Sequence, residues 1–458
     1  MKPETPPALN TDFRAALERL RAAGRLRTLN READPDLEIA ALMKRLDGTE
    51  ALLFPKVKGH TLPVIGNLLA SQANCEAAFG VDYREIRKFV ARALGSPVAP
   101  QHVAKAACQQ NVHREFDIGR LLPVLRHTEA DSGRFITAGI VVVRDPQTGV
   151  YNASYHRLQL LGRKQTAIKL DFGRHLRLAY EHAQKLKQDL PIAVCIGTDL
   201  AVHYTAATMG AQMPESADEL AVAGGLRGSP LPVVKCITNE LHVPADTEIV
   251  LEGKMRWQGA VREGPFAEFI GYLSPEGDAP VFEVEALTHR DEPIYHAING
   301  YGRETVMLRK YVMEASLLKA LQASVPIIHD AEMTAGGLHR FIAVLSVRKT
   351  SPQQEGLQRN AILAAFATLK DLDLVIAVDD DIDIRDPVDV EYALATRMEA
   401  SRDVFVIPDA RGHEYVRASN NGVVAKLGID ATVPFEDKAR FMRASFKEVE
   451  IREAEWLK

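Results

Sequence analysis

The opening of the chain alternates between helical and strand-like patterns of apolar residues. Thr11 or Asp12 is suited to cap a first helix, because the apolar positions that follow repeat at helical spacing. Short apolar runs at residues 52–54 and 62–65 predict strands, and a second helical pattern ends at Gly95. This opening part of the chain therefore predicts an α/β arrangement.

The middle of the chain carries short apolar runs that are separated by turn residues. Closely spaced strands with few helices between them are typical of a mostly antiparallel barrel or sandwich. The predicted strands cover residues 136–143, 150–161, 166–170, 192–196, 233–237, 248–252 and 281–286.

The last third returns to strands that alternate with helices, an order that predicts βαβ units and a parallel sheet. The predicted strands cover residues 341–347, 374–378 and 404–407, and the predicted helices cover 355–369 and 387–398. The charged tail after Phe435 predicts a terminal helix.

Composition narrows the class of protein. The 458 residues are 46% hydrophobic and 26% charged, as in average globular proteins, and the length predicts about two to four domains. The 56 basic and 61 acidic residues leave a net charge of −5 without a basic stripe, so no nucleic-acid partner is expected.

Cysteine usage and the N-terminal residues predict a cytoplasmic protein. The four cysteines are too far apart for a CxxC motif and too few for a disulfide framework, so we expect buried thiols. The first residues lack the apolar core of a signal peptide. No apolar run is long enough to predict a membrane span.

Candidate chemistry is concentrated around two carboxylates. The sequence contains no Walker loop and no HExxH, GxSxG or GxGxxG motif. An acidic run at residues 379–383 is most simply a solvated loop. Glu263 and Glu268 stand on either side of a Gly-Pro turn, and a carboxyl in an apolar setting has a raised pKa that suits an acid catalyst. Two glutamates near a turn are usually exposed, so the pair is informative only together with other segments.

Those other segments carry a resemblance to a known family. They are residues 151–157 (YNASYHR), 173–175 (GRH), 216–219 (SADE), 248–253 (EIVLEG), 263–268 (EGPFAE) and 426–432 (KLGIDAT). In this order they resemble the UbiD family of decarboxylases, carboxy-lyases that use prenylated FMN. The resemblance covers roughly residues 115–432.

The resemblance implies an α/β (α+β multidomain) fold in three parts. Residues 1–114 would form an N-terminal α/β domain, and residues 115–305 a central split β-barrel of flavin-reductase type that binds prenylated FMN. Residues 306–458 would form a C-terminal α/β oligomerisation domain with a parallel sheet and a terminal helix.

A manganese site is implied at Asn152, His175 and Glu219, where the ion would bridge the protein to the cofactor phosphate. Amide, imidazole and carboxylate groups suit a divalent cation. Each residue also has a structural interpretation: Asn152 in a turn, His175 at a helix start, and Glu219 in a capping box with Ser216. The spacing of 44 positions between Glu219 and Glu263 matches the family and favours the ligand. A potassium ion is also implied near the phosphate.

The implied reaction is reversible, non-oxidative decarboxylation through a covalent adduct with prenylated FMN. Arg157 and Glu263 would pair beside the reactive ring and Glu268 would donate the proton. The alternative is a salt bridge that only stabilises the barrel. The implied cofactor contacts are Asn152, Tyr155, His156, Arg157, Lys169, Leu170, Asp171, Arg174, His175 and Lys426.

Substrate identity is the most open question. His296, Asn299 and Arg303 are suited to bind a second carboxylate or a ring hydroxyl, or they only brace a loop. We expect a small aromatic or heteroaromatic acid such as furan-2,5-dicarboxylate, pyrrole-2-carboxylate or a hydroxybenzoate. The alternatives are a 4-hydroxy-3-polyprenylbenzoate of quinone biosynthesis, an FMN-dependent oxidoreductase activity, or a non-catalytic assembly partner.

The resemblance also implies two protein partners. A flavin prenyltransferase would supply the cofactor, and further copies of the chain would form a homodimer or homohexamer through the C-terminal domain.

Overall fold

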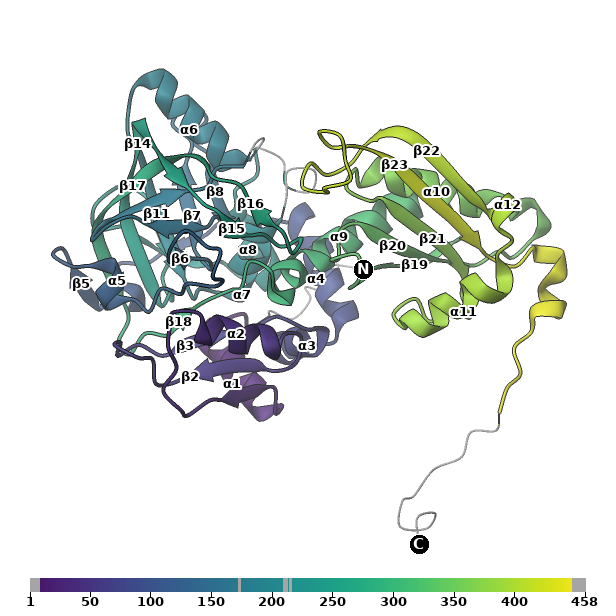
Figure 1. Ribbon diagram of the computed structural model, residues 1–458, viewed down its shortest axis with the longest axis horizontal. Helices are drawn as coiled ribbons and strands as arrows, with labels where there is room; N and C mark the ends of the chain where they lie inside the picture. The colour runs from purple at the N-terminus through teal and green to yellow at the C-terminus, as the bar shows by residue number, and fades with distance from the viewer. Residues whose placement is uncertain (1–8, 172–173, 209–212, 214–215, 447–458) are drawn as a thin grey trace, which may run out of the picture. The chain divides into compact units, whose positions relative to one another are not determined.

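The computed structural model describes residues 9–171, 174–208, 213 and 216–446. Two compact units are present (Figure 1). Unit 1 comprises the chain up to Ser316 together with Ala335–Arg340, and unit 2 comprises Leu317–Thr334 and the chain from Phe341 onward. The units are described one at a time.

The N-terminal part of unit 1 is a small sheet with helices, as predicted. Asp12 caps the first helix, because its Oδ1 accepts a hydrogen bond of 2.7 Å from the amide of Ala15. The helices are α1 (Phe13–Ala22), α2 (Glu38–Arg45), α3 (Gln72–Phe79) and α4 (Tyr83–Gly95). The sheet has the order β1 (Leu26–Thr28), β2 (Ala51–Phe54), β3 (Val64–Gly66) and β18 (Tyr295–His296). Because β18 comes from much later in the chain, it brings His296 into the N-terminal part.

The central part of unit 1 is a nine-stranded sheet in which the paired strands run antiparallel, as predicted. The strand order is β6-β9-β10-β17-β14-β11-β7-β8, and β5 also pairs with β17. The strands are β5 (Asn111–His113), β6 (Phe135–Ile136), β7 (Ile140–Arg144), β8 (Tyr151–Tyr155), β9 (Leu158–Leu160), β10 (Gln165–Ile168), β11 (Leu190–Ile196), β14 (Ile249–Glu263) and β17 (Gly277–His289).

Chain connectivity requires this sheet to curl. Strand β8 lies at one end of the strand order and β9 lies beside the other end, yet only His156 and Arg157 separate them along the chain. The two ends of the sheet must therefore approach each other at these two residues. The predicted single strand over residues 150–161 is wrong at this break, because the chain passes there from one end of the sheet to the other.

Helices cover the curled sheet (Figure 1). Helix α6 (His175–Leu186) packs on β7, β8, β11 and β14, whereas α7 (Leu200–Ala207) and α8 (Glu219–Arg227) pack on β8. The remaining elements of this part are α5 (Ile118–Leu121), η1 (Ala107–Gln109), a sheet of β13 (His242–Pro244), β12 (Pro232–Lys235) and β4 (Gln101–His102), and the pair β15 (Phe266–Ala267) and β16 (Leu273–Ser274).

Two further elements differ from the sequence predictions for physical reasons. The strand predicted at residues 248–252 continues to Glu263, because exposed polar residues follow the apolar run while pairing with β17 persists. Helix α9 (Arg303–Ser324) was not predicted. Polar residues such as Lys310 and Glu314 are as buried as its apolar ones, so no amphipathic stripe marks it in the sequence.

Unit 2 contains a five-stranded sheet in the order β19-β20-β21-β23-β22. The prediction of a parallel sheet is right only for the inner strands, because β19 and β22 pair antiparallel at the edges. The elements are β19 (Ile328–Met333), β20 (Ile342–Val347), η2 (Pro352–Gln354), α10 (Leu357–Thr368), β21 (Leu374–Asp379), α11 (Pro387–Arg397), α12 (Ala400–Asp403), β22 (Val404–Arg411), β23 (Val423–Ala431) and η3 (Phe435–Phe441). The predicted terminal helix begins as the 3-10 helix η3, and residues 447–458 lie outside the described residues.

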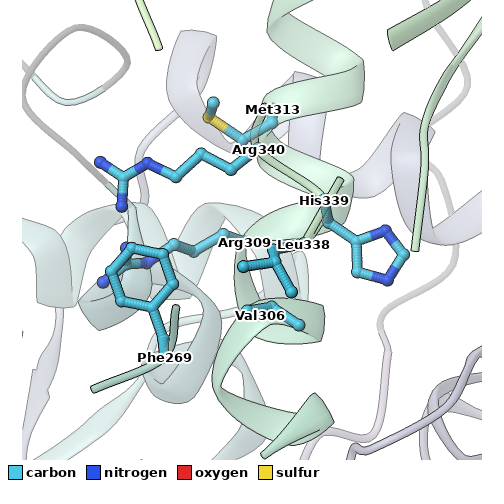
Figure 2. A pocket seen from close by; sticks show the side chains of 7 residues that line it. All are labelled: Phe269, Val306, Arg309, Met313, Leu338, His339 and Arg340. Atoms are coloured by element: carbon cyan, nitrogen blue, oxygen red, sulfur yellow. The ribbon is translucent and has the colours of Figure 1, made fainter. Parts of the chain in front are cut away.

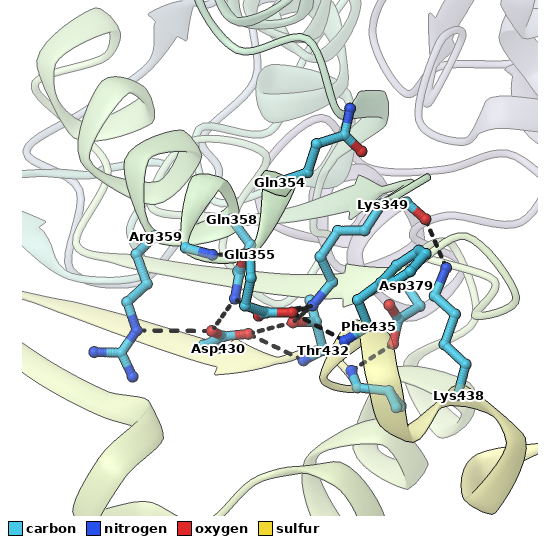
Figure 3. Close-up of polar contacts among 12 residues, drawn as sticks. Lys349, Gln354, Glu355, Gln358, Arg359, Asp379, Asp430, Thr432, Phe435 and Lys438 are labelled. Carbon is cyan, nitrogen blue, oxygen red and sulfur yellow. Dashed lines mark hydrogen bonds and ion pairs between the residues drawn. The ribbon is translucent and has the colours of Figure 1, made fainter. Parts of the chain in front are cut away.

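A buried polar network joins the carboxyl ends of the parallel strands in unit 2 (Figure 3). The Lys349 side chain is fully buried, and its Nζ donates to Thr432 Oγ1 and Glu355 Oε1, each at 3.1 Å. Glu355 Oε2 accepts from the amide of Phe435 at 2.9 Å, and Lys438 Nζ donates to the Lys349 carbonyl at 2.7 Å. The network therefore fastens η3 to the sheet.

We expect Lys349→Met to loosen this attachment. Thr432 and Glu355 lose a charge-assisted partner, so unit 2 should lose about 1–3 kcal/mol of unfolding free energy, and the Phe435 amide should exchange faster with solvent. Hydrogen exchange with mass spectrometry and chemical denaturation measure these effects. The same change at the exposed Lys370 is the control. Unchanged exchange at Phe435 in Lys349→Met would mean that the network does not hold η3.

Two expectations about the whole chain are also tested. All four cysteines are free and buried, as predicted, and burial raises the pKa of the Cys75 and Cys108 thiols to about 12. Within the described part of the chain, no helix combines the length and apolarity needed to cross a membrane.

Candidate active site

Arg157, at the junction of β8 and β9, makes a two-pronged ion pair with Glu263 at the end of β14. Arg157 Nε lies 2.7 Å from Glu263 Oε1, and Nη2 lies 2.8 Å from Oε2. The Arg157 side chain is 8% exposed and that of Glu263 is completely buried. Burial lowers the pKa of Arg157, but the hydrogen bond to Glu263 and the nearby carboxylates raise it more, so the guanidinium stays charged.

The chain after Glu263 turns sharply and brings Glu268 to the same guanidinium. Gly264 has a φ of 88°, and a Cβ there would meet the Pro275 carbonyl oxygen at 3.2 Å, so the turn needs glycine. Between β15 and β16 a second turn is closed by hydrogen bonds of 2.9 Å from the Glu268 amide to the Tyr272 carbonyl and from the Gly271 amide to the Glu268 carbonyl. The fold therefore fixes the backbone of both glutamates.

Glu268 completes an acid–arginine–acid trio. Its Oε1 contacts Arg157 Nη1, while Arg157 Nη2 donates to Ser274 Oγ at 3.0 Å. The ring of Phe266 lies 4.9 Å from the guanidinium carbon, which adds a cation–π contact. Burial raises the pKa of Glu268, and the opposing charge of Arg157 does not cancel this rise. Both carboxylates of the trio thus contact the Arg157 guanidinium, and burial makes Glu268 easier to protonate than an exposed glutamate.

A second cluster joins Asn152, His175 and Glu219, which come from β8, α6 and α8. Asn152 Nδ2 lies 2.6 Å from Glu219 Oε1 and 3.4 Å from His175 Nδ1, and His175 Nδ1 lies 3.3 Å from Glu219 Oε1. Glu219 is 2% exposed, and its Oε2 is buried without a hydrogen-bond partner. An unsatisfied buried carboxylate oxygen beside an imidazole and an amide suits a divalent cation.

The structure resolves the capping alternative for Glu219. Asp218, not Ser216, caps α8, because its Oδ1 accepts from the amides of Leu220 at 2.8 Å and Ala221 at 3.2 Å. The Glu219 side chain is therefore directed to the cluster rather than to a capping box. Within the described residues, no group of three or more His, Cys, Asp or Glu side chains could hold a metal ion, and this cluster contains two such residues beside an asparagine.

Hydrogen bonds connect the two clusters along β8. Asn152, Ser154 and His156 alternate along the chain and so lie on one face of the strand. Ser154 Oγ lies 3.0 Å from Asn152 Oδ1 and 3.1 Å from His156 Nε2, and His156 Nδ1 lies 2.9 Å from the Lys169 carbonyl oxygen. The residue after His156 is Arg157, so both clusters are positioned by one strand and its end.

The other predicted cofactor contacts of unit 1 lie around this strand. Tyr155 OH contacts His203 Nδ1, and burial raises the pKa of Tyr155 well above its usual value. The charge of Asp171 raises the pKa of Glu268 and that of Lys169 lowers it, so both lie within electrostatic reach of the trio. The remaining two are half-buried: Leu170, and Arg174 at the N-cap of α6. Residues 172–173, between them, lie outside the described residues.

The predicted substrate residues and Lys426 have other contacts. His296 is fully buried and its Nε2 lies 3.1 Å from Glu304 Oε1. Asn299 bonds to His127 Nδ1 at 2.9 Å and to the Ala40 carbonyl at 2.9 Å. Arg303 is exposed and lies against Gly48. In unit 2, Lys426 Nζ donates to the Lys370 carbonyl at 2.8 Å and lies 3.1 Å from Asp373 Oδ1. Nothing in these contacts supports the predicted roles, which stay predictions.

Several residues that position the site were not predicted from the sequence. Ser274 holds Arg157, Gln159 Oε1 accepts from the Gly264 amide at 3.0 Å, and His203 contacts Tyr155. Gln159 lies two positions after Arg157, which is a weak signal for a shared face. Ser274 and His203 have no sequence signal, since only the tertiary fold brings them near.

Three sequence models of one family match almost the entire chain. They describe the N-terminal, Rift-related and C-terminal domains of 3-octaprenyl-4-hydroxybenzoate carboxy-lyase, and they match residues 17–94, 101–302 and 306–431.

Individual proteins are similar over the same length. Anhydromevalonate phosphate decarboxylase of Methanosarcina mazei is 34% identical over 95% of this chain and 99% of its own. Gallate decarboxylase of Lactiplantibacillus plantarum is 30% identical over 93% of this chain and 94% of its own. The UbiD-class enzyme HmfF from Pelotomaculum thermopropionicum, solved with FMN, has a TM-score of 0.92 and 38% identity, covering 97% of this chain and 100% of that one. An evolved dimeric form of HmfF, solved with prenylated FMN, has a TM-score of 0.86 and 36% identity over 98% and 99%.

Proposed function

Because this chain belongs to the UbiD family of carboxy-lyases, we propose that it catalyses reversible, non-oxidative decarboxylation of a small aromatic or heteroaromatic acid with prenylated FMN. The observation that carries this proposal is the buried trio, in which Arg157 holds Glu263 and Glu268 together. A salt bridge that only stabilised the sheet would not need a second carboxylate with a raised pKa.

The residues of the second cluster fit the phosphate end of such a cofactor. Asn152, His175 and Glu219 would hold Mn²⁺, with the Asn152 amide presenting Oδ1 rather than Nδ2, and Tyr155, His156 and Lys169 would line the flavin. When bound, prenylated FMN would supply an electron-accepting ring, which the loss of carbon dioxide from an sp² carbon requires. The FMN and prenylated FMN held by HmfF support this assignment. Potassium near the phosphate and a phosphate contact of Lys426 stay predictions.

The chain's own residues would position the acid and move a proton. Arg157, fixed by Glu263 and Ser274, orients the reacting carboxylate and keeps Glu268 in place. After carbon dioxide departs, the protonated Glu268 gives its proton to the carbon that carried the carboxylate. In carboxylation Glu268 would remove that proton, so one residue serves both directions.

The raised pKa of Glu268 predicts the direction of the pH dependence. The protonated form donates the proton, so kcat/KM for decarboxylation should fall as the pH rises through that raised pKa. The fall in kcat/KM should therefore lie above about pH 4.3, the ordinary pKa of a glutamic acid. A pH–rate profile from pH 4 to 9 tests this. A flat profile over this range would contradict the role of Glu268.

Metal binding gives an independent prediction for Glu219. We expect Glu219→Gln to weaken Mn²⁺ binding by more than about 10-fold. Losing a residue that only supports a metal ligand usually costs about that much, and Glu219 would be a ligand itself. Electron paramagnetic resonance of free Mn²⁺, with FMN present, measures this. Glu181→Gln, at an exposed ion pair on the neighbouring α6, is the control. Equal Mn²⁺ binding by both variants would contradict the assignment.

Turnover of a panel of acids by the cofactor-loaded protein tests the activity itself. The panel contains furan-2,5-dicarboxylate, pyrrole-2-carboxylate, gallate, a hydroxybenzoate and a 4-hydroxy-3-polyprenylbenzoate, and carbon dioxide release is measured. We expect release from a small acid. NADH-dependent flavin reduction without carbon dioxide release would instead identify an oxidoreductase.

The proposal includes two protein partners. A flavin prenyltransferase would supply the cofactor, and the chain would assemble as a homodimer or larger homo-oligomer. The dimeric form of HmfF supports the second point for a related protein. A cytoplasmic location stays a prediction.

A further inference from the structure

The segment that carries Glu268 is bonded along its outer edge to the loop that precedes β6. Successive amides of a strand point to opposite sides, and the Glu268 amide donates within the β15–β16 pair. The Ala267 amide therefore points away from β16, and it donates to Asp131 Oδ1 at 3.2 Å. The Ser132 amide donates to the Pro265 carbonyl at 3.1 Å. Two hydrogen bonds from this loop thus hold the chain immediately before Glu268.

Asp131 is the buried centre of that loop. It is 4% exposed, and each of its carboxylate oxygens accepts two hydrogen bonds. Oδ2 accepts from the amides of His127 at 3.1 Å and Thr128 at 2.8 Å, whereas Oδ1 accepts from Thr128 Oγ1 at 2.8 Å and from Ala267. A carboxylate offers about four acceptor positions, so donors occupy all of them. This place requires a group that accepts on both sides, which a carboxylate does and an amide does not.

His127 packs against the aromatic ring that contacts Arg157. The rings of His127 and Phe266 meet edge-on with their centres 5.8 Å apart, and the Phe266 ring lies 4.9 Å from the guanidinium carbon of Arg157. Asn299 Nδ2 donates to a backbone carbonyl, so its Oδ1 accepts from His127 Nδ1 at 2.9 Å. Burial lowers the pKa of His127, so the ring packs as a neutral group. The loop thus supports the guanidinium as well as the glutamate of the trio.

The residue after Glu268 is also fixed. The Phe269 side chain is 8% exposed, and the centre of its ring lies 5.7 Å from the guanidinium carbon of Arg309 and 5.3 Å from that of Arg340 (Figure 2). Glu268 therefore lies between two fixed neighbours, Ala267 and Phe269. The bond at Ala267 is the charge-assisted one, and such bonds are about twice as strong as those between neutral groups.

We propose that Asp131 is a positioning residue for proton transfer, because by holding the Ala267 amide it keeps the Glu268 carboxyl against Arg157. A carboxyl that gives its proton to carbon has to lie within reach of that carbon, and a displacement of about 1 Å costs about 10²-fold in rate. Asp131 acts through the backbone and does not transfer the proton itself. Its part in the reaction rests on the proposed function, whereas its hold on the β15–β16 pair does not.

Asp131→Asn is the most selective variant, because it keeps the shape of the side chain. With the amide oxygen toward the two loop amides, the NH₂ group faces the Ala267 N–H, and the Thr128 hydroxyl can turn to accept from it. The opposite orientation places the NH₂ group against two loop amides and is therefore disfavoured. We expect the substitution to break the contact with Ala267 while the loop keeps its own hydrogen bonds.

Amide hydrogen exchange and turnover, both measured on cofactor-loaded protein, test the proposal. In Asp131→Asn we expect the amides of residues 266–272 to exchange at least about 10-fold faster. For an acid that the parent turns over, kcat should fall by about 10- to 100-fold while KM changes by less than about twofold. Glu129→Gln is the matched control, because it removes an exposed carboxylate from the same loop and should change neither quantity.

The possible outcomes separate this inference from the proposed function. Parent-like exchange at residues 266–272 in Asp131→Asn would overturn the inference, whether or not any acid is turned over. Faster exchange with a parent-like kcat, or a loss of kcat that only follows a loss of cofactor, would overturn the positioning role. A parent protein that turns over no acid would refute the proposed function, and faster exchange would still establish the hold of Asp131 on the β15–β16 pair.

Thermal unfolding verifies that each variant is folded. Asp131→Ser is the second variant should Asp131→Asn fail to fold, because a serine hydroxyl can accept from the loop amides but is too short to reach Ala267. It should give the same faster exchange and the same loss of kcat, and parent-like values of both would overturn the proposal.

Discussion

Glu268→Gln is expected to lower kcat for decarboxylation by about 10²- to 10⁴-fold, the usual contribution of a positioned acid. Glutamine keeps the size and the hydrogen-bonding capacity toward Arg157 but has no proton to give at neutral pH. Since burial already favours the neutral form of Glu268, as its raised pKa indicates, the neutral amide should not disturb the fold. The fall of the rate with rising pH should disappear together with the activity.

The measurement is single-turnover carbon dioxide release by protein with a verified cofactor content. Glu276→Gln is the matched control, because Glu276 is exposed and only pairs with Arg262 at 3.6 Å. Exchange with deuterated water of the product's ring proton, at the carbon that carried the carboxylate, should be lost in parallel. A Glu268→Gln protein that retains cofactor and turns over within about twofold of the parent would remove Glu268 as proton donor.

Arg157→Met is expected to affect both activity and stability. Without the guanidinium the completely buried Glu263 loses its bidentate partner, and breaking a buried pair in this way costs about 3–5 kcal/mol of unfolding free energy. Activity should fall below detection, because the same group orients the reacting carboxylate and Glu268. Arg157→Lys should restore part of the stability but little activity, since an ammonium cannot make the paired contact.

Urea denaturation measures the loss of unfolding free energy. Arg157→Lys distinguishes the loss of the ion pair from a simple packing defect, because lysine keeps a positive charge beside Glu263. Arg262→Met provides the comparison, because its pair with Asp278 at 3.0 Å is exposed and should contribute little. A loss in Arg157→Met no larger than this control would contradict the buried-pair account.

The sequence predicted elements with one buried face better than elements without one. Helix α4 ends at Gly95 as expected, because its apolar residues form a stripe. Helix α9 was missed because Glu314 and Lys310 are buried within it beside the apolar residues. Strand β14 was predicted too short because residues 256–262 are half-buried or exposed while the strand still pairs with β17.

For the candidate site, the family resemblance supplied the residue types, and the fold supplies their arrangement. Asn152, His175 and Glu219 are far apart in sequence yet lie within 3.4 Å of one another in the structure. Local pattern alone would have assigned His175 to a helix start, which is where it lies. The support from Ser274 could not be predicted, because it depends on a contact between segments that carry no shared motif.

The mass of the flavin extracted from the protein after co-expression with a flavin prenyltransferase tests most directly whether the protein binds a modified cofactor. We predict prenylated FMN in the parent protein and in Glu268→Gln, and a strong loss of it in Glu219→Gln. A co-expressed parent protein that carries no flavin, or only unmodified FMN, would contradict the claim that these two clusters surround a single modified cofactor.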